Sequence, residues 1–170
     1  MPYKHMTEQV NNSLWRLSRK SNVISNVLSD EIKVDVAIVG GGFTGVSAAL
    51  RLAEAGTDVA VLEAHFNGYG GSGRNVGLTN AGLWRNPDDI DNDIGKKYGG
   101  RLHQFLSDAP DLVHDLIDQH NIECDALRNG TLHLAHSPAG LKAIEDRALQ
   151  INARGGSVMG LDREDTYKLT

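Results

Sequence analysis

KVDVAIVGGGFTGVSAALRLAEAGTDVAVLEA, residues 33 to 64, changes its hydrophobic period twice. Residues 33–40 are mostly β-branched or small, which is typical of a buried strand in a parallel sheet. From Thr44 to Ala55 the apolar residues instead recur every three or four positions, on one face of a helix. Gly56 suits the position just past a helix end, and 57–64 is a second apolar strand. The stretch therefore predicts a right-handed βαβ unit within an α/β fold.

A glycine pattern joins the first predicted strand to the helix. Gly40, Gly42 and Gly45 fit G-x-G-x-x-G in the context that gives this pattern its meaning. We expect the first glycine to permit a tight turn and the second to let a pyrophosphate approach the backbone. The third lets the helix pack closely on the strand. The free N–H groups and the positive dipole end of the helix would then face the phosphates.

An acidic residue closes the second predicted strand. Glu63 follows Gly45 by 18 residues, where a carboxylate accepts hydrogen bonds from a ribose hydroxyl. A carboxylate at this place also disfavours a ligand with a 2′-phosphate. The glycines and Glu63 together predict an adenine dinucleotide, and they leave NAD and FAD open.

A second glycine-rich stretch, GYGGSGRNVG, occupies residues 68–77. FAD is longer than NAD on its flavin side, so a second backbone segment must lie against it, and small residues permit that approach. Ser72 can donate its hydroxyl to phosphate, and backbone N–H groups of residues 72–78 can face phosphate or flavin oxygens. Arg74 and Asn75 either bind phosphate or fix the loop to its own domain. For Arg74, a solvated surface charge is the alternative.

The two stretches together resemble FAD-dependent oxidoreductases of the D-amino-acid-oxidase (DAO) superfamily, most of all the gamma-glutamylputrescine oxidoreductase branch. Members carry the dinucleotide fingerprint, the acidic strand end and then a loop like G-A-S-G-R-N-G-G. The similarity continues through IGKKYGGRLHQFL (94–106) and beyond, so it covers most of the chain from residue 33 onward. The chain departs from the family at Gly71, an alanine there, and at Val76, where the family has a glycine. A positive φ at Val76 would strain its backbone.

The resemblance implies a Rossmann-type FAD-binding fold followed by the beginning of an α+β substrate domain. It also implies oxidation of a C–N bond in an amine or amino acid by hydride transfer to flavin, with oxygen or another electron acceptor. We expect non-covalent FAD because the second loop has no histidine, and we name no catalytic acid or base. The residues expected to bind the cofactor are Gly40, Gly42, Phe43, Thr44, Gly45, Glu63, Ala64, Gly71, Ser72, Gly73, Arg74, Asn75, Val76 and Gly77.

Two other readings remain open at this point. An NAD-dependent dehydrogenase domain explains residues 34–63 and leaves the second glycine loop without a role. A non-catalytic nucleotide-binding fragment, or pseudoenzyme, explains both loops without turnover. Fold alone does not decide between them.

The chain is expected to have three parts: a lead-in over 1–30, an FAD-binding domain over 31–122, and the start of a substrate domain over 123–170. In the lead-in, Leu14 and Trp15 are the expected anchor, with a frayed tail as the alternative. Beyond the second loop the pattern predicts a helix broken at Gly99-Gly100, helices over 101–108 and 110–120, a hairpin over 124–137 around Asn129-Gly130, a helix from Pro138 to about Gly155, and a short strand over 157–161.

The last residues predict the start of a further helix at Asp162, with Asp165 three residues on. A dinucleotide-binding sheet also needs more than two parallel strands. We therefore expect the N-terminal part of a longer protein, and a complete small domain is the alternative.

Composition narrows the partners. The net charge of −5 and the pI near 5.7 argue against a nucleic-acid or anionic-membrane surface. No apolar stretch reaches the roughly 18 residues that span a bilayer, and the first residues show no signal peptide. Cys124, the single cysteine, suits a reducing compartment, so we expect a cytoplasmic protein. We expect Cys124 in the core, and no metal site, because His133 and His136 would point to opposite faces of a strand.

Overall fold

The computed structural model describes residues 13–20 and 23–169. The chain divides into two compact units, one ending at Leu78 and the other beginning at Thr79, and each is described by itself. Much of the predicted lead-in, residues 1–12 and 21–22, lies outside the described residues. The predicted domain limits at residues 30 and 122 stay predictions.

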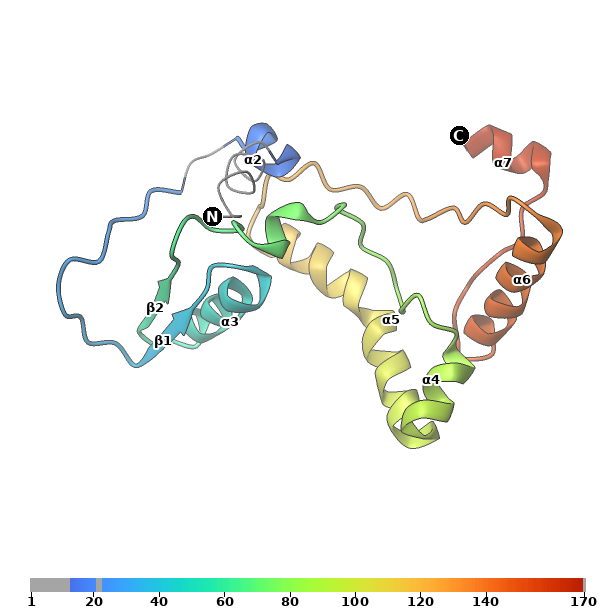
Figure 1. The fold of residues 1–170 in the computed structure, drawn as a ribbon, viewed down its shortest axis with the longest axis horizontal. Helices are drawn as coiled ribbons and strands as arrows, with labels where there is room; N and C mark the ends of the chain where they lie inside the picture. The colour runs from blue at the N-terminus through green and yellow to red at the C-terminus, as the bar shows by residue number, and fades with distance from the viewer. Residues whose placement is uncertain (1–12, 21–22, 170) are drawn as a thin grey trace, which may run out of the picture. The chain divides into compact units, whose positions relative to one another are not determined.

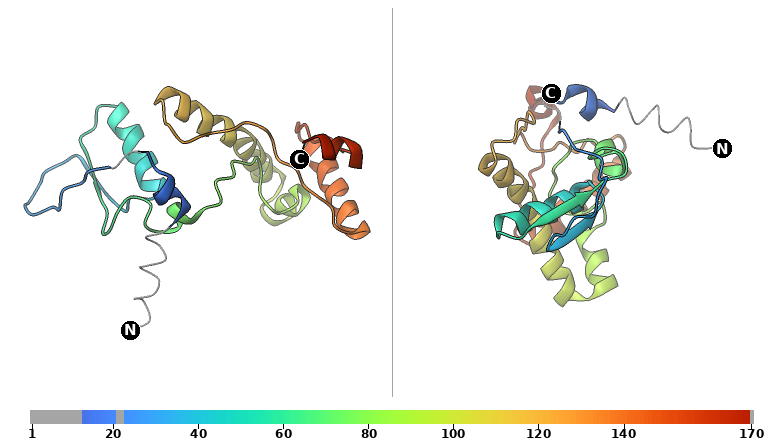
Figure 2. Two further views of the ribbon diagram at one scale, coloured as in Figure 1. Left: turned by 90° about the horizontal axis from the view of Figure 1, so that it is seen from above. Right: turned by 90° about the vertical axis from the view of Figure 1, so that its left-hand side faces the viewer.

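The first unit contains the predicted βαβ arrangement (Figure 1). Strand β1 spans Val36–Val39, helix α3 spans Phe43–Glu54 and strand β2 spans Val59–Leu62. The strands pair in parallel, with Val36 opposite Val59 and Val39 opposite Leu62. Helix α3 packs against the strand pair, which Figure 2 shows from two further directions. The unit is thus a small parallel sheet with its crossover helix, as the sequence predicts.

Helix α3 ends as the sequence predicts. Gly56 has φ +80° and donates its N–H to the carbonyl of Ala53 at 2.9 Å. The next residue, Thr57, donates to the carbonyl of Leu52 at 3.0 Å. These two bonds form a Schellman motif, which satisfies carbonyls that the helix leaves free.

Strand β1 is less buried than predicted. Val36 and Ile38 are half-buried, whereas Ala37 and Val39 are exposed, and Val39 shows 87% of its surface. The prediction of a buried strand was therefore wrong for Ala37 and Val39, which lie on the same face of β1. Because side chains alternate between the two faces of a strand, one helix packed on the pair can cover only one set.

The second unit is helical. Helix α4 spans Pro87–Ile94, α5 spans Lys96–Gln119, α6 spans Pro138–Asn152 and α7 spans Arg163–Leu169. The predicted caps are confirmed: Ser137 Oγ accepts the N–H of Gly140 at 3.0 Å, and Asp162 Oδ1 accepts that of Asp165 at 2.8 Å. A side-chain oxygen at this position pairs one of the N–H groups that a helix start leaves free.

The predicted break at Gly99-Gly100 was wrong. The chain turns at Gly95, with φ +79°, and α5 runs without interruption through both glycines. A Cβ at Gly99 would collide with the side chain of Asp91 on α4. Gly99 is therefore a contact point between two helices, a role that does not require it to end one.

The predicted start of a new helix at Pro110 was also wrong. Pro110 lies inside α5, where it has no N–H to donate to the carbonyl of Leu106. That carbonyl instead accepts a long bond, 3.4 Å, from the N–H of Gly82. A contact from outside the helix thus replaces the missing bond within it.

The predicted hairpin over 124–137 and strand over 157–161 do not form. Among the described residues, 124–136 make no backbone pairing, although Gly130 keeps the positive φ, +79°, of the expected turn. Side chains hold this segment: the ring of His133 stacks on Trp84 at 5.1 Å, and Thr131 Oγ1 donates to Asn80 Oδ1 at 2.6 Å. A strand requires a paired neighbour, which the sequence pattern alone does not provide.

An ion cluster joins α4, α5 and the turn just after α6. Arg154 Nη2 lies 2.6 Å from Asp88 Oδ1 and 2.6 Å from Asp91 Oδ2. Asp91 Oδ1 also lies 2.9 Å from His103 Nε2. The hydrogen bond from Arg154 holds the pKa of Asp91 below its ordinary value, and the bond with His103 acts in the same direction. Ile90 directly precedes Asp91 in α4. It is 6% exposed and is the buried large hydrophobic side chain among the described residues.

Substitution of Asp91 tests the cluster. A lowered pKa means that the ionised carboxylate stabilises the fold above the ordinary aspartate pKa of about 4, and that this contribution is lost as pH falls below it. We expect Asp91→Asn to lower the melting temperature at pH 7 and to flatten its decline between about pH 5 and pH 3. Thermal unfolding across this range measures both effects. The matched control, Asp89→Asn, changes an exposed carboxylate of the same helix and should keep the wild-type profile. Identical profiles for all three proteins would contradict the cluster's role.

Candidate functional site

Two loops of the first unit meet at the start of α3. One follows β1 and carries Gly40 and Gly42; the other follows β2 and includes the 3₁₀ turn η1, Gly71–Arg74. The N–H of Gly68 donates to the carbonyl of Gly41 at 2.9 Å, which links the loops through their backbones. Residues about thirty positions apart in sequence thus form one small surface.

The first loop has the geometry that its glycines predict. Gly40 has φ +106°, a conformation that favours glycine. A Cβ at Gly45 would collide with the carbonyl oxygen of Gly40, and a Cβ at Gly42 would stand 2.9 Å from Ser72 Oγ. The absence of these side chains keeps α3 close to β1 and keeps its first turn accessible. Phe43 and Thr44, the first two residues of α3, are exposed.

Glu63 lies beside this loop, half-buried at the end of β2. Its Oε2 accepts the N–H of Gly41 at 2.8 Å, and its Oε1 accepts the N–H of His65 at 3.0 Å. These two hydrogen bonds lower the pKa of Glu63 and keep its carboxylate ionised at neutral pH, and the bond from Gly41 has the larger effect. Each carboxylate oxygen has a second lone pair, so a ribose hydroxyl can still donate to it. Ala64 follows and is exposed.

Ser72 connects the second loop to the helix start. Its Oγ accepts the N–H of Phe43 at 2.9 Å. That bond occupies one of the N–H groups that α3 leaves free, and the hydroxyl keeps its own hydrogen to donate. Ser72 can therefore hydrogen-bond the helix and an anion at the same time.

The rest of the second loop is held by its own side chains. Arg74 Nε donates to the carbonyl of Gly70 at 3.2 Å. Asn75 Nδ2 donates to the carbonyl of Ser72 at 2.6 Å, and Asn75 Oδ1 accepts the N–H of Gly77 at 2.7 Å. Of the two roles expected for Arg74 and Asn75, these contacts support fixing the loop.

Val76 shows none of the strain that a positive φ would cause. Within the described chain, the non-glycine residues with positive φ are Asn121 and Asp125. The positive φ in this loop falls one residue later, at Gly77, with +74°. The side chain of Val76 is 79% exposed and makes no close packing demand on the loop.

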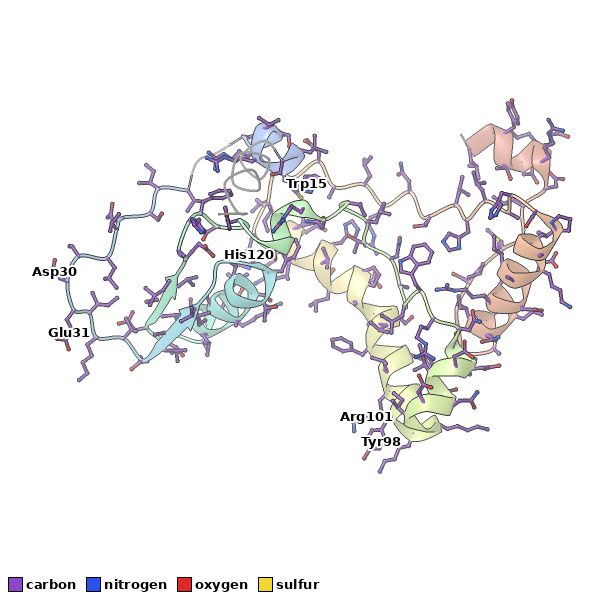
Figure 3. The ribbon with its side chains drawn as sticks, viewed as in Figure 1. Trp15, Asp30, Glu31, Tyr98, Arg101 and His120 are labelled. Carbon is purple, nitrogen blue, oxygen red and sulfur yellow. The ribbon has the colours of Figure 1, made fainter. Side chains whose placement is uncertain are left out.

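Sequence reasoning missed two residues of this site. Gly41, the middle residue of the glycine triplet, has no place in the G-x-G-x-x-G spacing, yet its N–H binds Glu63. Trp15 was expected only as an anchor, but its Nε1 donates to the carbonyl of Asn75 at 2.8 Å (Figure 3). The extra glycine was a visible signal for Gly41. No spacing rule connects residue 15 to residue 75.

The two histidines rejected as metal ligands from the sequence, His133 and His136, lie in the second unit. His133 and His136 both line a cavity of about 280 Å³ beside Trp84, so the expected placement on opposite faces of a strand was wrong. Among the described residues, no group of three or more His, Cys, Asp or Glu side chains is arranged to hold a metal ion. Cys124 is exposed, so its expected place in the core was also wrong. No helix in the described part of the chain is long and apolar enough to cross a bilayer.

Two substitutions in the second loop test its packing. A Cβ at Gly73 would collide with the carbonyl oxygen of Gly68, whereas a Cβ at Gly71 meets nothing within 4 Å. We expect Gly73→Ala to reduce the free energy of unfolding by about 1–3 kcal/mol, as overpacking does. The matched control, Gly71→Ala, should change it by less than about 0.5 kcal/mol. Urea unfolding measures both, and equal losses would show that the close approach at Gly73 does not constrain the loop.

Comparison with known proteins identifies a family and several relatives. The family described as FAD dependent oxidoreductase (DAO) matches residues 35–170. Gamma-glutamylputrescine oxidoreductase of Escherichia coli (strain K12) is 36% identical over 142 residues, which are 84% of this chain and 33% of that protein. Probable oxidoreductase OrdL of Rhizobium meliloti (strain 1021) is 32% identical over 136 residues, or 79% of this chain and 32% of that protein.

A shorter similarity is to a thiamine thiazole synthase of Methanococcus vannielii, which is 39% identical over 84 residues, 47% of this chain and 32% of that protein. No solved structure gives a significant match. The chain spans about a third of the length of the curated relatives it matches. The family match over most of the chain shows that the chain belongs to the DAO family of FAD-dependent oxidoreductases.

Proposed function

We propose that the first unit binds the adenosine and pyrophosphate parts of FAD at the start of α3, in an enzyme that oxidises a C–N bond of an amine or amino acid. The observation that carries this proposal is the convergence of three features within one unit. The start of α3 is free of side chains at Gly42 and Gly45, Ser72 stands beside it, and the ionised Glu63 lies at the end of β2.

Each group has a distinct part in binding. The N–H groups at the start of α3 and the hydroxyl of Ser72 would donate to pyrophosphate oxygens, because a helix start favours negative charge. Glu63 would accept from the ribose of the adenosine. The backbone of Gly71–Gly77 would lie along the rest of the cofactor, held by Asn75. FAD is non-covalent in this proposal because residues 68–77 contain no histidine.

The substrate class is supported by a relative. The name of the Escherichia coli protein refers to gamma-glutamylputrescine, and we propose a small amine or amino acid for this chain on that support. When bound, FAD supplies the hydride acceptor that converts the C–N bond to an imine, and oxygen or another acceptor then takes the electrons. The protein's part is to hold the cofactor and to exclude side reactions.

A visible absorption spectrum of the protein at its full natural length tests the cofactor and the reaction together. We expect a flavin spectrum that bleaches when a primary or secondary amine is added without oxygen, and that returns when oxygen or another acceptor is supplied. A colourless protein that binds NADH would contradict the assignment to FAD. A stable flavin spectrum that no amine or amino acid bleaches would contradict the proposed substrate class and leave FAD binding intact.

Substitution of Glu63 tests its proposed bond to ribose. Glu63→Gln keeps a carbonyl acceptor but removes the charge, and hydrogen bonds to charged groups contribute about 1.5–3 kcal/mol. We expect the dissociation constant for FAD to rise about 10- to 100-fold, measured by the recovery of flavin fluorescence on dilution. Glu31→Gln, which neutralises an exposed carboxylate ahead of β1, is the control and should leave it unchanged (Figure 3). An unchanged constant for Glu63→Gln would remove Glu63 from the site.

A further inference from the structure

A short helix ahead of the βαβ unit contacts the second glycine loop. Helix α2 spans Leu14–Ser18, and Trp15 projects from it toward η1 (Figure 3). The indole Nε1–H donates to the carbonyl of Asn75 at 2.8 Å. The edge of the same ring lies close to Gly77, where a Cβ would stand 2.6 Å from Trp15 Cη2 and Cζ2. One side chain therefore contacts the loop by a hydrogen bond and by the outer edge of its ring.

A second contact attaches α2 to the segment after β2. The guanidinium of Arg16 lies 4.1 Å from the ring centroid of Phe66, within the range of a cation–π interaction. Phe66 in turn packs edge-on against Tyr69 at 5.2 Å. Both ends of the segment from Phe66 to Gly77 thus contact neighbouring residues of one short helix.

Apolar burial does little to hold α2 in this position. Leu14 and Leu17 are 68% and 69% exposed. A cavity of about 310 Å³ lies beside Trp15, lined by Ser13, Leu14 and residues 73–76. The contact between α2 and the loop therefore depends on the specific bonds of Trp15 and Arg16 more than on packed surface.

The contacts of Trp15 continue through the loop to α3. Asn75, whose carbonyl Trp15 binds, also bonds the carbonyl of Ser72 and the N–H of Gly77. Ser72 accepts the N–H of Phe43 at the start of α3. We propose that Trp15 is a positioning residue that holds residues 72–77 in the conformation in which Ser72 meets the helix start, and that it thereby sets the affinity for FAD. This inference rests on the proposed role of that loop in binding FAD.

We call the contacts of Trp15 with Asn75 and Gly77 the clamp. Hydrogen exchange without FAD tests the clamp itself, at the N–H groups of Phe43 and Gly77. Trp15→Ala removes both the donor and the ring, so we expect these amides to exchange about tenfold faster, the size expected for one lost hydrogen bond. Trp15→Phe keeps a ring without the donor and should give an intermediate rate. Leu17→Ala, an exposed change on the same helix, is the matched control and should exchange as the wild type does.

A double substitution tests the contact between Trp15 and Gly77. Gly77→Ala strains the backbone at φ +74° and places a methyl group against the indole. In the Trp15→Ala background the indole is gone and only the backbone strain remains. We therefore expect Gly77→Ala to accelerate exchange by a smaller factor there than in the wild-type background. Equal factors in the two backgrounds would show that the ring does not constrain residue 77.

Binding of FAD separates this inference from the proposed function. We expect the dissociation constant for FAD to rise about tenfold in Trp15→Ala, less in Trp15→Phe, and not at all in Leu17→Ala, with a matching change in the visible circular dichroism of the bound flavin. If the wild type does not bind FAD, the proposed function fails, while the exchange rates still test the clamp. If the amides of Phe43 and Gly77 exchange in Trp15→Ala at the wild-type rate, the clamp is overturned. Faster exchange with unchanged affinity would overturn its effect on the cofactor.

Discussion

The close approach of α3 to β1 is the constraint on which the candidate site depends. A side chain at Gly45 would collide with the carbonyl of Gly40, so glycine alone allows the helix to begin so near the strand. This approach sets the first turn of α3 beside the end of β2, within reach of Ser72. The ionised Glu63 then accepts the N–H of Gly41, two residues before α3 begins at Phe43. The close approach at Gly45 thus brings the carboxylate of Glu63, the hydroxyl of Ser72 and the exposed backbone at the start of α3 together.

Features governed by neighbouring residues could be read from the sequence. The βαβ order, the end of α3 at Gly56, and the start of α6 at Ser137-Pro138 each follow from local period or capping chemistry. The hairpin could not be predicted reliably, because the pattern over 124–137 specifies a strand but not its partner. Gly99 and Pro110 were misread for a related reason. Their effect on α5 is decided by Asp91 and Gly82, which belong to other segments.

The candidate site likewise contains residues that could be predicted from the sequence and contacts that could not. The spacing of Gly40, Gly42, Gly45 and Glu63 matches what a phosphate and a ribose would require, so the sequence alone was enough to name them as candidates. The internal bonds of the second loop were not predictable in detail, although small residues there indicated a close approach. Trp15 lies sixty residues from its partner Asn75, and nothing in the local pattern of residues 13–20 indicates that contact. Hydrogen bonds between side chains and residues distant in the sequence are the part of the site that the sequence does not predict.

Pro110 shows how an imperfection in one helix can organise a segment outside it. An interior proline weakens a helix by about 3 kcal/mol, partly because one carbonyl loses its partner. In α5 the carbonyl of Leu106 is left available to the N–H of Gly82, two residues before Trp84. A residue with its own N–H at position 110 would compete for that oxygen. The helix would then gain regularity as the neighbouring loop lost one of its attachments, so local stability and the order of its surroundings would change in opposite directions.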